Sequence, residues 1–173
     1  MELYEWGWIK KIPRIAVINA DGANTLDVLY NGKFENTELR WNKGNPYTKL
    51  IEDYYVKMNK DHIRPKTKAT AIQIGKPVNL LKGIRALEFT DGVVTTVTDK
   101  EMLDGMSIVG LNGFDCEMAS GAVPAGIKKL LNDNIMKKDD KIIGILTGRQ
   151  KEPLLPINYH NDPTNKFAKP PKR

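Results

Sequence analysis

The stretch KATAIQIGKPVNLLKGIRALEFTDGVVTTVTDKEM, Lys68–Met102, decides the fold class. It begins with an apolar run that predicts a strand ending at the turn Ile74-Gly75-Lys76-Pro77. A helical stripe follows, and the alternating residues GVVTTVTD then predict a second strand. Thr98 and Glu101 have the spacing of a capping box, so we expect another helix to begin there. This strand–helix–strand–helix order is typical of a parallel α/β fold.

The segments on either side continue the pattern. RIAVINA, Arg14–Ala20, predicts a buried strand followed by a short helix. ASGAVPAGIKKLLNDN, residues 119–134, predicts a helix whose small residues allow close approach to a sheet or ligand. DDKIIGILTG, residues 139–148, predicts a further buried strand that ends in a glycine turn.

The chain has 173 residues, enough for one domain with a core. We expect residues 1–150 to form that α/β domain and residues 31–68 to be a polar insertion in it. A helix near 47–58 is predicted inside the insertion by its apolar stripe. Residues 151–173 carry five of the ten prolines, so we expect an irregular tail.

Composition excludes several classes of protein. No apolar run approaches the roughly 20 residues that span a bilayer, and the amino terminus lacks the pattern of a secretory signal. The single cysteine, Cys116, fits a reducing cytoplasm, where we expect the protein to work. The net charge of +6 is spread among acidic residues or concentrated in the tail, so we predict neither nucleic-acid nor membrane binding.

Three predicted turns carry the candidate site residues. They are residues 74–77, the run Cys116–Ser120 and the run Leu146–Gly148. Ligands bind beyond the carboxyl ends of parallel strands, so turns gathered at one sheet edge would form a site. Each also has an ordinary explanation as a turn or helix cap, and composition alone names no ligand. The sequence contains no zinc-ligand spacing, no Ser-His-Asp set, and no dinucleotide or Walker motif.

Several motifs in order resemble threonine synthase, a pyridoxal-phosphate (PLP) enzyme of fold type II, the tryptophan-synthase-β-like group. They are YEWGWIKKIPRIAVINADGAN, ATAIQIGKPVN, GVVTTVTDKEM, EMASGAVPAGIKKL and IIGILTG, followed by GRQKEPLLPINYH in the tail. The resemblance implies a three-layer fold with a parallel sheet, here an incomplete large domain, and PLP as the cofactor. It matches residues 31–68 least well.

The resemblance also implies roles for five residues. Ile74 and Gly75 would bring bare backbone close to the cofactor ring, where a side chain on the glycine would collide. Thr147 corresponds to the hydroxyl residue that bonds the pyridine nitrogen and leaves it unprotonated. Glu117 and Ser120 match a turn beside the same pocket. This chain departs from the family pattern at Lys76, Met118 and Arg149.

The family's Schiff-base lysine motif and phosphate-binding loop do not occur in this sequence. We therefore expect this chain to be a carboxyl-terminal portion of such an enzyme or one half of a split enzyme. We expect it to be inactive alone, because no other residue can take the place of the lysine that forms the Schiff base. Its expected partners are the amino-terminal half, the substrate O-phospho-L-homoserine and a second copy in a homodimer. Two alternatives stay open: an inactive interaction or regulatory module that keeps the fold, and a related PLP amino-acid dehydratase.

Overall fold

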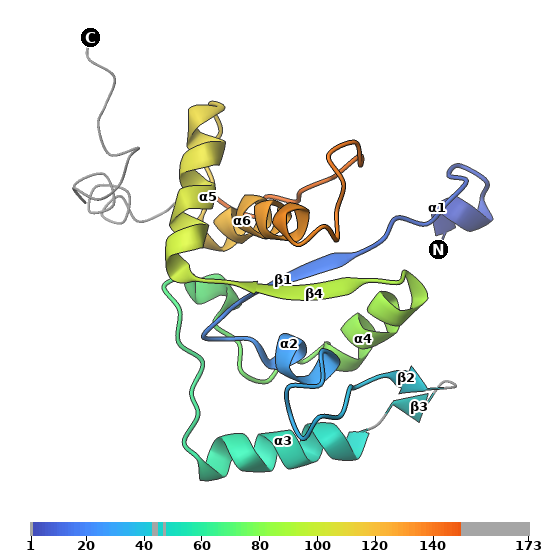
Figure 1. The fold of residues 1–173 in the computed structure, drawn as a ribbon, viewed down its shortest axis with the longest axis vertical. Helices are drawn as coiled ribbons and strands as arrows, with labels where there is room; N and C mark the ends of the chain where they lie inside the picture. The colour runs from blue at the N-terminus through green and yellow to red at the C-terminus, as the bar shows by residue number, and fades with distance from the viewer. Residues whose placement is uncertain (1, 43–44, 47, 150–173) are drawn as a thin grey trace. The chain divides into compact units, whose positions relative to one another are not determined.

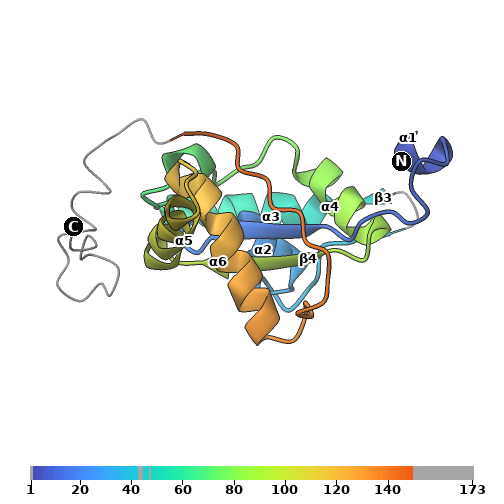
Figure 2. The same cartoon turned by 90° about the horizontal axis from the view of Figure 1, so that it is seen from above.

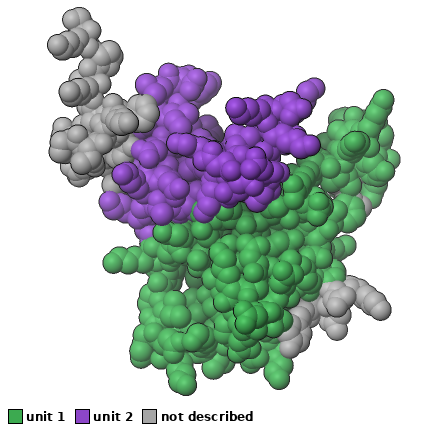
Figure 3. Space-filling view, in the orientation of Figure 1, with its two compact units in different colours: residues 1–66, 73–96 green, residues 67–72, 97–173 purple. Residues whose placement is uncertain are grey.

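The computed structural model describes residues 2–42, 45–46 and 48–149. They form two compact units, shown in Figure 3. Unit 1 contains residues 1–66 and 73–96, and unit 2 contains residues 67–72 and 97–173. Each unit is described by itself below. No helix in the described part of the chain is long and apolar enough to cross a bilayer.

Unit 1 is built on a two-stranded parallel sheet. β1 (Ala16–Ala20) pairs with β4 (Val93–Val97), and Figure 1 shows the two strands running in the same direction. The connection begins with α2 (Thr25–Tyr30) and ends with α4 (Leu80–Phe89), as the sequence predicts for a parallel crossover. The α/β class and two of the four predicted strands are therefore confirmed. The short helix α1 (Glu2–Glu5) precedes them.

The core of unit 1 includes residues from the segment predicted to be a polar insertion. α3 (Thr48–Lys60) buries one face of the predicted helical stripe, and the short antiparallel pair β2 (Trp41–Asn42) and β3 (Asn45–Pro46) precedes it. The buried cluster joins α2, α3 and α4 to β4: Leu29, Tyr30, Phe34, Leu39, Leu50, Tyr54, Met58, Leu80, Ile84, Leu87 and Val94. Residues 31–60 thus take part in core packing.

The prediction of a strand at residues 69–74 is wrong. A 3-10 helix, η1 (Thr70–Ile72), occupies the centre of this stretch. Its backbone groups bond locally: the Thr70 N–H donates to the Lys68 carbonyl, and the Ile72 N–H to the Ala69 carbonyl. The segment is also anchored to the start of the helix α5 (Asp99–Leu111), because the Asp99 carboxylate accepts hydrogen bonds from the Thr67 hydroxyl and the Lys68 N–H. These local bonds take the place of a strand ladder.

Unit 2 is a pair of crossing helices followed by an extended segment. α5 (Asp99–Leu111) and α6 (Met118–Asn132) touch where two glycines meet. A Cβ on Gly105 would overlap the Gly121 carbonyl, and one on Gly121 would overlap the Met102 carbonyl. The small residues of α6 were predicted to permit close approach to a sheet or ligand; in the structure Gly121 instead allows close contact with another helix, α5.

The prediction of a buried strand at residues 139–148 is also wrong. Residues 141–149 leave α6 as an extended segment that belongs to no strand, visible in Figure 2 after α6. Ile143 and Ile145 are 88% and 70% exposed. The apolar composition predicts a buried strand correctly only where a neighbouring strand supplies the pairing. No described residue of unit 2 provides one.

The predicted capping box at the start of α5 is confirmed. The Thr98 hydroxyl accepts from the Glu101 N–H at 3.2 Å, and the Glu101 carboxylate accepts from the Thr98 N–H at 2.7 Å. The bond from the Thr98 N–H, more than the other interactions, lowers the pKa of Glu101 below its ordinary value of 4.5.

This cap gives α5 a pH-dependent contribution to stability. The pKa of Glu101 is lower in the folded chain than in the unfolded chain, so the ionised carboxylate stabilises the fold at any pH above the unfolded-state pKa. This stabilisation is lost as the pH falls through the folded-state pKa. We expect Glu101→Gln to lower the free energy of unfolding at neutral pH and to match the wild type in acid. Urea unfolding at a series of pH values measures this. A difference that stays constant with pH contradicts the prediction.

Candidate functional site

The amino terminus of α6 positions two of the predicted site residues. Glu117 is the residue before the helix, with extended backbone angles, φ −71° and ψ 162°. Its carbonyl accepts from the Ser120 N–H at 3.0 Å, the first turn of the helix. Ser120 is 1% exposed, so its hydroxyl is buried under the turn and must find partners there.

Thr147 supplies those partners from the extended segment. Its N–H donates to the Ser120 Oγ at 2.9 Å, and the two hydroxyl oxygens are 3.2 Å apart. The Thr147 hydroxyl also donates to Glu117 Oε1 at 3.0 Å. A hydroxyl has one proton, so with the Thr147 proton on Glu117 the Ser120 hydroxyl is the donor to Thr147. Glu117, Ser120 and Thr147 thus form one hydrogen-bonded group, which we call the Thr147 group.

Gly148 lets the segment lie close to the helix. The Glu117 N–H donates to the Gly148 carbonyl at 2.9 Å. A Cβ on Gly148 would lie 2.6 Å from Glu117 Oε1, so a larger residue would displace the carboxylate that Thr147 binds. Arg149 pairs with Asp115 at 3.5 Å on the surface. The Leu-Thr-Gly turn and the start of α6 therefore hold each other in place.

Ile74 and Gly75, the other two predicted site residues, belong to unit 1. The Gly75 carbonyl accepts from the buried Thr25 hydroxyl at 2.6 Å. A Cβ on Gly75 would lie 3.2 Å from Pro65 Cδ and 3.3 Å from Met58 Cε. A side chain at position 75 would therefore crowd these neighbours within unit 1. The Ile74 side chain is 48% exposed.

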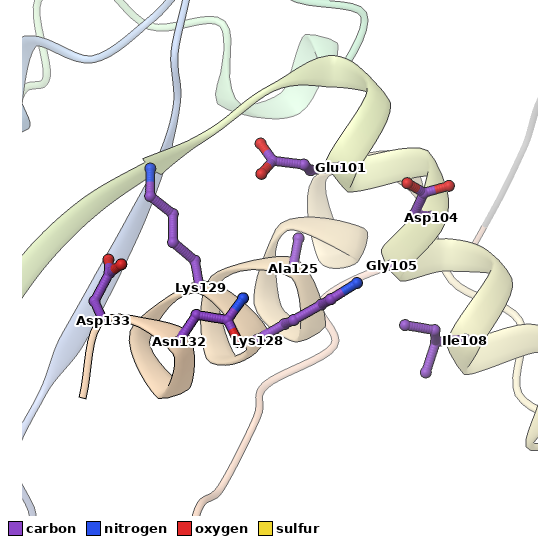
Figure 4. Close-up of a pocket in the computed structure, with 9 residues that line it drawn as sticks. All are labelled: Glu101, Asp104, Gly105, Ile108, Ala125, Lys128, Lys129, Asn132 and Asp133. Carbon is purple, nitrogen blue, oxygen red and sulfur yellow. The ribbon is translucent and has the colours of Figure 1, made fainter. Parts of the chain in front are cut away.

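Sequence reasoning missed a pocket of about 210 Å³ between α5 and α6, shown in Figure 4. It is lined by Glu101, Asp104, Gly105, Ile108, Ala125, Lys128, Lys129, Asn132 and Asp133. Charged side chains of both signs surround the small residues at the helix crossing. The stripe of small residues in α6 was the available signal, but only the crossing of the two helices reveals the hollow.

Other chemistry is limited in the described part of the chain. Those residues hold no group of three His, Cys, Asp or Glu side chains that could bind a metal ion. Burial, more than the nearby carboxylates of Asp115 and Glu117, raises the pKa of the Cys116 thiol. The thiol is therefore protonated at neutral pH and is a poor nucleophile. The Thr147 group is the strongest candidate for ligand binding.

No family model matches the chain. Curated relatives do. The chain is 32% identical over 162 residues to the threonine synthase of Methanocaldococcus jannaschii, covering 91% of this chain and 34% of that protein. It is 29% identical over 168 residues to the threonine synthase of Methanosarcina acetivorans, covering 89% of this chain and 41% of that protein. It is 25% identical over 166 residues to threonine synthase 2 of Arabidopsis thaliana.

These comparisons confirm the resemblance read from the sequence motifs. The chain is threonine synthase-like over about nine tenths of its length, and it spans roughly a third of the relatives it matches: 34%, 41% and 28% of the three proteins above.

Proposed function

We propose that this threonine synthase-like chain forms one part of a PLP-dependent lyase of fold type II. Together with the remainder of such an enzyme it converts O-phospho-L-homoserine and water to L-threonine and phosphate. The proposal is supported by the similarity to threonine synthases over about nine tenths of the chain. The observation that carries it is the Thr147 group, because it joins the three residues of unit 2 that the resemblance assigns to the cofactor pocket.

The donor set of the Thr147 group suits one edge of the cofactor. PLP, when bound, supplies the electron sink for chemistry at the carbons of an amino-acid substrate. The Thr147 side chain is exposed, and its hydroxyl is held by two hydrogen-bonding neighbours. A hydroxyl so positioned can bond the ring nitrogen of a pyridine without carrying a charge there, once it turns its proton toward the ligand. The residues present therefore fit the group.

The arrangement also decides where the Thr147 proton goes. In this structure Thr147 donates to Glu117, so toward any ligand its oxygen offers a lone pair. To bond an unprotonated ring nitrogen, the hydroxyl must turn its proton from Glu117 to the ligand. The buried Ser120 hydroxyl keeps the Thr147 oxygen in place in either orientation, because it remains within 3.2 Å.

Two requirements of the reaction fall to the remainder of the enzyme. The cofactor needs a lysine to hold it covalently and a loop to bind its phosphate, and the motifs for both are absent from this sequence. We assign to this chain the contacts to the ring edge, and to its partner the covalent and phosphate contacts.

Complementation tests this division of roles. We expect O-phosphohomoserine to yield threonine and phosphate when the chain is co-expressed with the part of the M. acetivorans relative outside the matched region. We expect neither piece alone to do so, and the chain alone to retain no PLP through gel filtration. Threonine is measured by chromatography and PLP by its absorbance. A stoichiometric yellow species formed by this chain alone contradicts the assignment.

The same experiment separates the alternatives. If the two pieces form a stable complex that releases no phosphate from O-phosphohomoserine, the chain is an interaction module. Release of a 2-oxoacid and ammonia from threonine or serine indicates a dehydratase.

A further inference from the structure

One face of α5 forms the acidic wall of the pocket between α5 and α6. It contributes Glu101, Asp104, Gly105 and Ile108, at positions i, i+3, i+4 and i+7, which share one face of a helix. Gly105 has no side chain, so the helix surface is recessed between the carboxylates and the Ile108 side chain. This wall therefore offers two acidic groups beside an apolar surface.

The opposite wall comes from α6 and has the same spacing but basic side chains. It contributes Ala125, Lys128, Lys129 and Asn132, again at positions i, i+3, i+4 and i+7. Ala125 is small and buried, so this wall is recessed too. Figure 4 shows the lysines on α6 and the two carboxylates on α5, with Asp133 at the end of α6. The pocket thus has an acidic side and a basic side.

The two sides do not close the pocket with an ion pair between Glu101 and Lys128. In the described part of the chain no ion pair includes Lys128. Its charge is nevertheless among those that lower the pKa of Glu101, after the larger effect of the bonds from Thr98. Those bonds, from the Thr98 N–H and hydroxyl, both go to Glu101 Oε2, at 2.7 and 2.9 Å. Glu101 Oε1 and the Lys128 ammonium group are therefore available to a ligand.

The size and charge of the pocket limit what it can bind. A dry apolar cavity of about 150 Å³ admits benzene, and pockets for drug-sized molecules begin at about 300 Å³. At about 210 Å³, this pocket takes a molecule of roughly amino-acid size. A ligand with one positive and one negative group suits both walls, whereas an ion of either sign is repelled by one of them. None of the lining residues belongs to the Thr147 group.

We propose that this pocket binds a free α-amino acid as its zwitterion. The ammonium group of the ligand lies against the carboxylates of Glu101 and Asp104. The ligand's carboxylate accepts hydrogen bonds from Lys128 and Asn132, and its side chain rests on Ile108. The bound molecule bridges the two helices, so it stabilises their crossing. This site does not rest on the proposed function.

An NMR titration of the full chain tests the site with three matched probes. L-Valine carries both charges, isobutylamine is valine without its carboxylate, and isovalerate is valine without its amine. We expect L-valine to shift the amide signals of Gly105, Ala125 and Asn132 to saturation. Each analogue should bind about tenfold more weakly, because it loses the charged hydrogen bonds to one wall. Shifts that never saturate overturn the proposal, as does equal binding of L-valine and either analogue.

Substitutions on the two walls test the orientation of the ligand. Lys128→Gln should weaken the binding of L-valine and isovalerate about tenfold, because it removes the charge on the basic side. It should not weaken the binding of isobutylamine. Asp104→Asn should have the opposite pattern, with weaker binding of L-valine and isobutylamine and no loss for isovalerate.

A matched control separates the pocket from general surface charge. Lys100 is an exposed lysine of α5 that does not line the pocket, so Lys100→Gln makes the same change outside it. We expect this variant to bind all three probes like the wild type. Equal weakening by Lys100→Gln and Lys128→Gln overturns the site, and so does unchanged binding of L-valine by Lys128→Gln. The comparison of probes on the wild type decides the proposal even where a variant does not fold.

Discussion

Gly121→Ala is expected to lower the free energy of unfolding by about 1–3 kcal/mol, the usual cost of overpacking a close contact. The added Cβ would overlap the Met102 carbonyl and lie 2.8 Å from Met106 Cγ. The methionine side chain can move, but the carbonyl belongs to the backbone of α5. The two helices must therefore separate, and the groups packed at their crossing lose contacts.

The control for this change is Gly110→Ala, in the exposed part of α5. No atom lies within 4 Å of a Cβ at Gly110. We expect this substitution to stabilise the chain by about 0.5–1 kcal/mol, because alanine is the better helix former. Urea unfolding followed by circular dichroism measures both variants. Two alanine variants of equal stability would show that the crossing of α5 and α6 is looser than described here.

Helices were predictable from the sequence because their signals are local. The capping box at Thr98 and Glu101 fixes the start of α5, and the apolar stripe of α4 buries Leu80, Ile84 and Leu87. Both signals act within a few residues of the chain. The structure therefore forms these helices where the patterns predict them.

Strands were less predictable because they depend on partners distant in the sequence. RIAVINA and GVVTTV pair with each other and form β1 and β4. ATAIQIG and IIGILTG have similar composition, yet the first turns into η1 and the second stays unpaired. Apolar composition shows that a segment can be buried. Whether it forms a β-strand depends on a neighbouring strand that pairs with its backbone.

The candidate site was predictable only through its resemblance to a family. Glu117 and Ser120 are 27 or more positions from Thr147, and no spacing rule joins them. That Gly75 makes room for a ligand stays a prediction; within unit 1, a Cβ there would also lie 3.2 Å from Pro65 Cδ and 3.3 Å from Met58 Cε. The pocket between α5 and α6 depends on how two helices cross, which a single sequence does not reveal.

The Thr147 hydroxyl is the atom on which the proposed function depends most. In the complex with its complementary part, we expect Thr147→Val to reduce cofactor affinity or turnover by about tenfold to a hundredfold. The valine keeps the shape but removes a hydrogen bond to a buried partner, which costs roughly 1–3 kcal/mol, and each 1.4 kcal/mol corresponds to about tenfold.

Thr147→Ser is the control, because it keeps the hydroxyl that donates to Glu117 and lies against Ser120. We expect it to lose much less activity than the valine variant. A structural role alone would give a different pattern: the backbone bond from residue 147 to Ser120 persists in both variants, and valine suits extended backbone well. Cofactor titration by absorbance and threonine formation measure both variants, and urea unfolding reports any loss of fold. If the valine variant keeps full activity while the serine variant does not, Thr147 does not contact the cofactor.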